Sequence, residues 1–222
     1  MFKTEVAVEI AARRMDYRTR IAAASLVAGP LLMTIGDLFH PEESMNNAEQ
    51  IAILANDASR WYAAHLLLFI GILLTIPGML ALTNLVALRK PAAGYAARIL
   101  ILIGVAAFAA VFVGEMLVGR FVLDGGSRDG AIALLNSMLS GPMIAAVGPP
   151  MLAFFIGVAA LARPLVSGGG LLRWTAGLYS IGALLILIEI VSAQVMLSQI
   201  GNFLIFCGGA TAARVTLRNG NA

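Results

Sequence analysis

Five ionisable side chains could do chemistry because they lie inside or directly beside strongly apolar stretches. They are the carboxylates Asp37, Glu115 and Glu189 and the imidazoles His40 and His65. Carboxylates and imidazoles are the usual protein ligands of Zn²⁺, Fe and Mn. Asp37, His65, Glu115 and Glu189 are therefore candidate ligands for a divalent metal ion of this group, or for a small cationic ligand.

The three carboxylates share one spacing. Each follows an arginine (Arg20, Arg98 or Arg173) by 16 or 17 residues. At 1.5 Å per helical residue the acid lies about 25 Å from its arginine, near the far side of a hydrocarbon layer ~30 Å thick. Charged groups in a bilayer generally face the bundle interior or a wet cavity. We therefore expect the three acids to meet in one pocket, with Glu189 the deepest. The shared spacing also indicates three helical hairpins related by duplication.

The two histidines allow other chemistry. His65 falls at the expected depth of the acids, and His40 precedes Pro41 at the end of the first apolar run. Together they are candidate cofactor ligands, as an axial pair for haem b, although His40 lies in a loop. A metal held by His65 and the acids could instead activate water. A metal-dependent hydrolase of lipid-like substrates is therefore one alternative function.

Composition defines the elements that position these groups. Of the 222 residues, 60% are hydrophobic and only 12% are charged, against about 25% charged in ordinary soluble domains. This balance excludes a soluble enzyme, a disordered regulator and a nucleic-acid binder, and it predicts an all-α bundle embedded in a lipid bilayer. Six runs are long enough to span it: 21–38, 62–88, 99–119, 142–161, 174–197 and 200–217. We expect a single transmembrane domain over 20–218, between a basic segment 1–19 and a short tail 219–222.

The basic residues predict the orientation. Arg60, Arg120 and Arg128 lie in the segments expected outside, whereas the other lysines and arginines lie in the segments expected inside. The excess of positive charge in cytoplasmic loops then places both termini in the cytoplasm of a bacterium, with the chain in the inner membrane. The net charge of +3 follows from this asymmetry, and no nucleic acid or other polyanion is needed to explain it.

Two segments on the expected outer side have the spacing of short amphipathic helices. In 48–57 the apolar face is formed by Ile51, Leu54 and Ala58, and in 131–139 by Ile132, Leu135 and Leu139. We expect both to lie on the outer surface, where they could close the pocket.

The remaining groups on that side have simpler interpretations. Arg60, Trp61 and Tyr62 form a typical anchor at the membrane interface. Glu43 is read as a solvated loop charge.

Two further functions stay open. Gly141-Pro142 and Gly148-Pro149-Pro150 interrupt the fourth span, and broken helices line the sites of transporters, so a small transporter is one. An accessory subunit of a larger membrane complex, or a homo-oligomer, is the other. The lone Cys207 leaves no disulfide chemistry.

Two motifs carry a family resemblance. The first helix ends in Asp37-Leu38-Phe39-His40-Pro41, and the second opens on Arg60-Trp61-Tyr62-Ala63-Ala64-His65. In these features the chain resembles uncharacterised families of small six-helix bacterial membrane proteins, over most of residues 20–215. The resemblance implies the six-helix fold and transfers no catalytic residue.

Overall fold

A computed structural model describes residues 2–44, 46–138 and 140–220. This part of the chain is entirely helical apart from its turns and loops. Six of its seven helices are long and apolar enough to cross a membrane, which confirms the all-α prediction and is consistent with an integral membrane protein. The helices are α1 Phe2–Phe39, α2 Asn47–Ala87, α3 Pro91–Leu123, α4 Arg128–Met138, α5 Gly141–Ser167, α6 Gly170–Ser192 and α7 Val195–Gly220.

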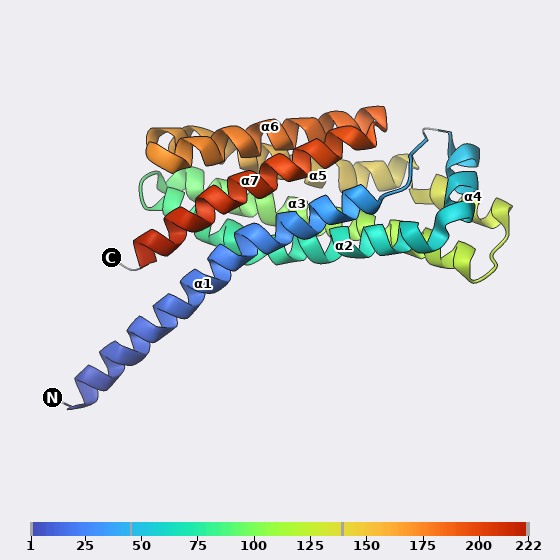
Figure 1. Cartoon of the computed structure of the whole chain (residues 1–222). Helices are drawn as coiled ribbons and strands as arrows, with labels where there is room; N and C mark the ends of the chain where they lie inside the picture. The colour runs from blue at the N-terminus through green and yellow to red at the C-terminus, as the bar shows by residue number, and fades with distance from the viewer. Residues whose placement is uncertain (1, 45, 139, 221–222) are drawn as a thin grey trace.

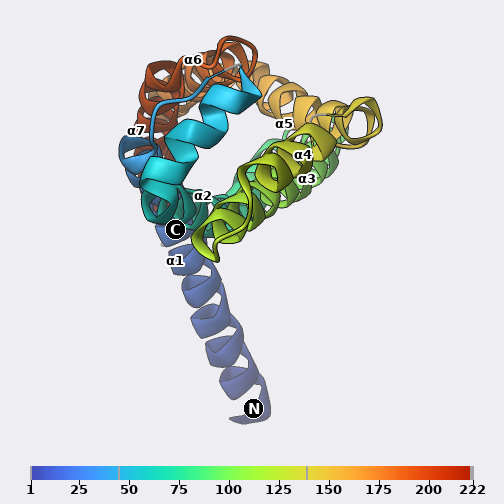
Figure 2. The same ribbon diagram turned by 90° about the vertical axis from the view of Figure 1, so that its right-hand side faces the viewer.

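The six long helices form a closed ring. Around it α1 packs on α2, α2 on α3, α3 on α5, α5 on α6, α6 on α7, and α7 back on α1, with the least extensive contact between α5 and α6. Both chain ends lie at one end of the bundle, whereas α4 and the long loops lie at the other, which we call the α4 end (Figure 1, Figure 2). The three-hairpin repeat and the cytoplasmic placement of the termini stay predictions.

Glycines bring α6 and α7 into backbone contact. A Cβ atom built on Gly182 would lie 2.5 Å from the carbonyl oxygen of Gly201, and one on Gly201 would lie 2.8 Å from that of Gly182. Such approaches are possible only between residues without side chains, which is the usual role of small residues between membrane helices. This contact fixes the two helices that carry Glu189 and Asn202.

The predicted fifth span, 174–197, extends beyond the C-terminal end of the helix that the structure shows. Helix α6 stops at Ser192 because Ala193 is left-handed, with φ 51° and ψ 32°, and α7 starts at Val195. The turn is formed by Ser192, Ala193 and Gln194 and holds neither glycine nor proline, so the sequence lacks the usual stop signals there. The prolines at 149 and 150, by contrast, do not interrupt α5, which removes the broken-helix argument for a transporter.

The two amphipathic segments cap the α4 end. The first is the start of α2, set off from the spanning part by a non-helical kink at Asp57 (φ −131°, ψ 32°), and the second is α4. Ile51 and Leu54 pack with Leu135 in a small apolar cluster that also holds Trp61. Of the predicted apolar faces, Ile132 is half-buried, and Leu139 falls outside the described residues. The segments therefore bury their apolar faces against each other and the bundle.

Candidate functional site

A cavity of about 310 Å³ lies inside the helical ring, and every helix contributes to its wall. All the ionisable residues singled out from the sequence line it, namely Asp37, His40, His65, Glu115 and Glu189. The start of α2 and α4 together cover the α4 end, and we call them the cap. The cap contributes to the wall as well, through Gln50 of α2 and Leu135 of α4. The structure thus brings the predicted carboxylates and histidines to one cavity.

The cavity is polar at the α4 end and apolar beyond it. Along α2 its lining runs from Trp61 and His65 to Met79, a rise of roughly 27 Å from Trp61 at 1.5 Å per residue. The wall away from the α4 end is mostly apolar and aromatic; it includes Met33, Ile72, Met79, Phe108, Phe154 and Ile205. The cavity is therefore amphipathic along its length.

Asp37 is held by α7. Its side chain lies in the last turn of α1, and the residue is 5% exposed. Asn202 Nδ2 donates to Asp37 Oδ2 at 2.7 Å, and Gln199 Nε2 donates to the Asp37 carbonyl at 3.0 Å. Asn202 Oδ1 has no hydrogen-bond partner although the residue is buried and lines the cavity. An acceptor is thus left open beside the carboxylate.

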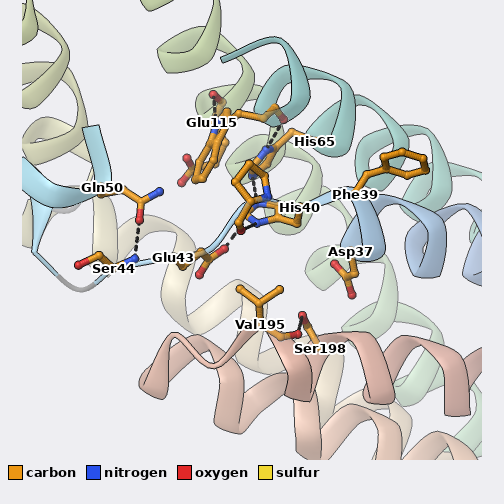
Figure 3. Close-up of polar contacts among 12 residues, drawn as sticks. Asp37, Phe39, His40, Glu43, Ser44, Gln50, His65, Glu115, Val195 and Ser198 are labelled. Carbon is orange, nitrogen blue, oxygen red and sulfur yellow. Dashed lines mark hydrogen bonds and ion pairs between the residues drawn. The ribbon is translucent and has the colours of Figure 1, made fainter. Parts of the chain in front are cut away.

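His40 and His65 lie side by side in the cavity wall, with their Nε2 atoms facing each other. Their Nε2 atoms are 3.4 Å apart, as Figure 3 shows. His40 Nδ1 lies 2.7 Å from the carbonyl oxygen of Pro41, and His65 Nδ1 lies 2.9 Å from that of Trp61. A carbonyl oxygen can only accept, so each Nδ1 must carry the hydrogen. In the neutral imidazoles each Nε2 then bears a lone pair.

Three acceptors therefore converge without a donor. Besides the two Nε2 atoms, Glu43 Oε1 lies 3.5 Å from His40 Nε2. Burial lowers the pKa of His40 below its ordinary value of 6.5, while the adjacent Glu43 carboxylate and the Pro41 carbonyl act in the opposite direction. The imidazole of His40 is thus poorly suited to supply the missing proton itself. A bound group that donates hydrogen bonds would complete the cluster.

Glu43 joins the acids into one group. It lies close enough to Asp37, Glu115 and Glu189 to interact electrostatically with each of them, and it lines the cavity. Glu43, interpreted from the sequence as a solvated loop charge, is half-buried and thus also belongs to the cavity wall. Glu189 lies three residues before the end of α6 and Glu115 lies eight before the end of α3, and their relative depth in the membrane stays a prediction.

Trp61, which we expected at the membrane interface, forms part of the cavity wall. It is 4% exposed, and its ring centroid lies 4.8 Å from that of His40 and 4.6 Å from that of His65. Its Nε1 donates to the Glu115 carbonyl at 3.1 Å. The predicted anchor motif is thus turned inward at this residue, because Trp61 joins the apolar cluster between the start of α2, α4 and α3.

Arg60 positions His40 from outside the cavity. Its Nε donates to the Phe39 carbonyl at 2.6 Å and its Nη2 to the His40 carbonyl at 3.3 Å. Asp57 lies 3.7 Å from Arg60 Nη1. Membrane anchoring by Arg60 and by the half-buried Tyr62 stays a prediction.

The metal and haem hypotheses gain no support from the geometry. Within the part of the chain that the structure describes, no three His, Cys, Asp or Glu side chains form a group suited to a metal ion. Metal binding by Asp37, His65, Glu115 and Glu189 stays a prediction. The imidazoles of His40 and His65 pack edge to face with centroids 4.8 Å apart, so this arrangement leaves no space for a porphyrin between them.

The polar cavity residues that sequence reasoning missed include Glu43, Gln50 and Asn202. Asn202 had a detectable signal, since Ser198 and Asn202 are four residues apart on one face of an apolar helix, and both are buried. The side-chain Nε2 of Gln50 is buried without a hydrogen-bond partner, while its Oε1 accepts from the Ser44 amide at 2.6 Å. Its position depends on the folded cap.

The fold and the site define a multi-pass helical membrane protein with an amphipathic internal cavity. Comparison with protein-family models, curated protein sequences and solved structures finds no match to this chain. Its function has to be argued from the cavity.

Proposed function

We propose that the protein binds a small organic cation at the α4 end of the cavity. One observation carries this proposal: Asp37, Glu43, Glu115 and Glu189 line a single cavity, and no lysine or arginine is among its described lining residues. Asp37 is buried and the other three are half-buried, and carboxylates brought together with limited access to water favour a balancing positive charge. A bound cation or bound protons would supply it, since the described wall holds no lysine or arginine.

An organic ammonium fits this wall better than a metal ion. A transition metal needs several ligand atoms converging at about 2.0–2.3 Å, and the described side chains form no such group. An ammonium group donates hydrogen bonds at about 2.7–2.9 Å to acceptors spread around it. The cavity offers three neighbouring acceptors, from His40, His65 and Glu43.

The orientation of the protein in its membrane is the second part of the proposal. We propose that the α4 end faces outward from a bacterial inner membrane, with both termini in the cytoplasm. The short turns at the opposite end carry Arg89, Lys90 and, flanking the second turn, Arg173, which supports this orientation by the positive-inside rule.

Thermal unfolding of the purified protein in detergent tests the function. We expect butylammonium to raise the midpoint and butyrate, its anionic counterpart, to leave it unchanged, because ligands that bind only the folded state stabilise it. Glu43→Gln should reduce the shift, whereas Glu42→Gln, at the exposed neighbouring position, should retain it. Equal shifts with butyrate, or in both variants, would contradict cation binding. A shift with Zn²⁺ but none with butylammonium would favour the metal hypothesis instead.

A further inference from the structure

A small cation at the α4 end would leave the apolar part of the cavity empty. This unfilled apolar part indicates that the ligand also has an apolar portion. We infer that the ligand is a long-chain primary amine whose ammonium group binds at the α4 end and whose aliphatic chain occupies the apolar part. This inference rests on the proposed cation binding and specifies the ligand class for the same site.

The head group is specified by hydrogen-bond roles. His40 Nε2, His65 Nε2 and Glu43 Oε1 are acceptors without a donor among them. A primary ammonium has three N–H donors and no acceptor, as the lysine side chain shows, so its donors match these acceptors in kind and number. A trimethylammonium group has the same charge but no N–H. The cluster should therefore select the primary amine by hydrogen bonding, beyond its attraction for positive charge.

The chain is specified by the shape and lining of the cavity. From His65 the wall continues along α2 through Leu68, Ile72 and Thr75 to Met79, a rise of roughly 21 Å. This distance is most of the ~30 Å thickness of a hydrocarbon layer. Phe108, Val111 and Phe154 line it from α3 and α5. An apolar space of this length beside a charged end fits an aliphatic chain better than a compact ion.

We place the access route between α5 and α6, because they are the neighbouring helices of the ring with the least extensive contact. Residues 141–146, at the start of α5, are all exposed, and a Cβ atom on Gly141 would meet no atom within 4 Å. On α6, Ile190 is 40% exposed although it lines the cavity. Figure 2 shows α5 beginning beside α4, away from the outer end of α6. The cavity thus reaches the lipid-facing surface where an amphipathic molecule would already lie in the bilayer.

Tryptophan fluorescence can report binding without an added label. The chain has two tryptophans, and Trp174 is exposed on the far part of α6, so Trp174→Phe leaves Trp61 beside the histidines as the only reporter. In nanodiscs we expect dodecylammonium brominated near its head group to quench Trp61 saturably. The N,N,N-trimethyl derivative of that probe and the equally brominated dodecanoate should bind at least about tenfold more weakly.

A pair of valines on α3 tests the chain site. Val111 lines the cavity, whereas Val113 is 38% exposed and is not among its lining residues. In the Trp174→Phe background, Val111→Phe should weaken saturable quenching by the brominated amine at least about tenfold, and Val113→Phe should leave it unchanged. Retained butylammonium stabilisation in Val111→Phe would show that the variant is folded and that the head-group site is intact.

The outcomes distinguish binding of a long-chain amine from the more general binding of a cation. Equal quenching by the primary and trimethyl probes, or equal affinity in the two valine variants, would overturn the long-chain amine while butylammonium binding still stood. If the unmodified protein showed neither stabilisation by butylammonium nor binding of the probe, cation binding itself would be overturned.

Discussion

His40 and His65 present their Nε2 atoms to each other at 3.4 Å while both Nδ1 atoms face backbone carbonyls. This relationship makes the pair an acceptor site when both rings are neutral. It also links the protonation of His40 to folding, because the charged form of a buried imidazole is poorly solvated.

Stability should fall as the pH is lowered. The pKa of His40 is lowered in the folded protein, chiefly by burial, so below about 6.5 the unfolded chain binds a proton that the folded chain does not. Folding is then favoured above that pH, and stability is lost from about pH 6.5 downward toward the folded pKa, by at most roughly 1.4 kcal/mol per pH unit.

Thermal midpoints of the wild type and of His40→Asn between pH 8 and pH 5 measure this effect. Asparagine can still donate to the Pro41 carbonyl but does not titrate. The groups around His40 that also act on it, Glu43, Arg60 and His65, are present in both proteins. We expect the difference between them to change with pH in the stated direction, and a difference independent of pH would contradict the assignment.

The glycine contact between α6 and α7 gives a prediction about packing. Gly182→Ala should destabilise the protein by about 1–3 kcal/mol, because the new methyl group would meet the Gly201 backbone, which cannot rotate away. Gly177→Ala is the matched control on the same helix, since a Cβ there would meet no atom within 4 Å. Reversible unfolding in mixed micelles measures both. Similar losses in the two variants would mean that α6 and α7 do not approach at Gly182.

Much of the site was predictable because the bilayer restricts where charges can lie. Asp37, Glu115 and Glu189 fall at one end of apolar helices, and a carboxylate there is driven toward an interior cavity. The periodicity of Ile51 and Leu54 likewise predicted a helix with a buried face, and both residues are buried.

The rest depended on contacts that leave no local pattern. Glu43 reaches the cavity because Arg60 holds the carbonyls of Phe39 and His40, an interaction between residues some 20 positions apart. Ala193 ends α6 in a left-handed conformation although alanine favours helix. Trp61 turns inward because the cap supplies an apolar cluster for it. Each of these features is decided by tertiary packing.

The pair of Asp37 and Asn202 gives the last prediction. Asn202→Ala removes the donor at 2.7 Å from Asp37 Oδ2 and leaves the buried carboxylate with one donor fewer beside Ser198, which typically costs about 1–3 kcal/mol. Asp37→Leu combined with Asn202→Ala removes both polar groups, so the double variant should lose less stability than the sum of the two single variants. A double-mutant cycle of unfolding free energies measures this coupling. Strict additivity would show that the hydrogen bond between α1 and α7 does not stabilise the fold, and butylammonium binding in the same variants would show whether Asp37 contributes to the cation site.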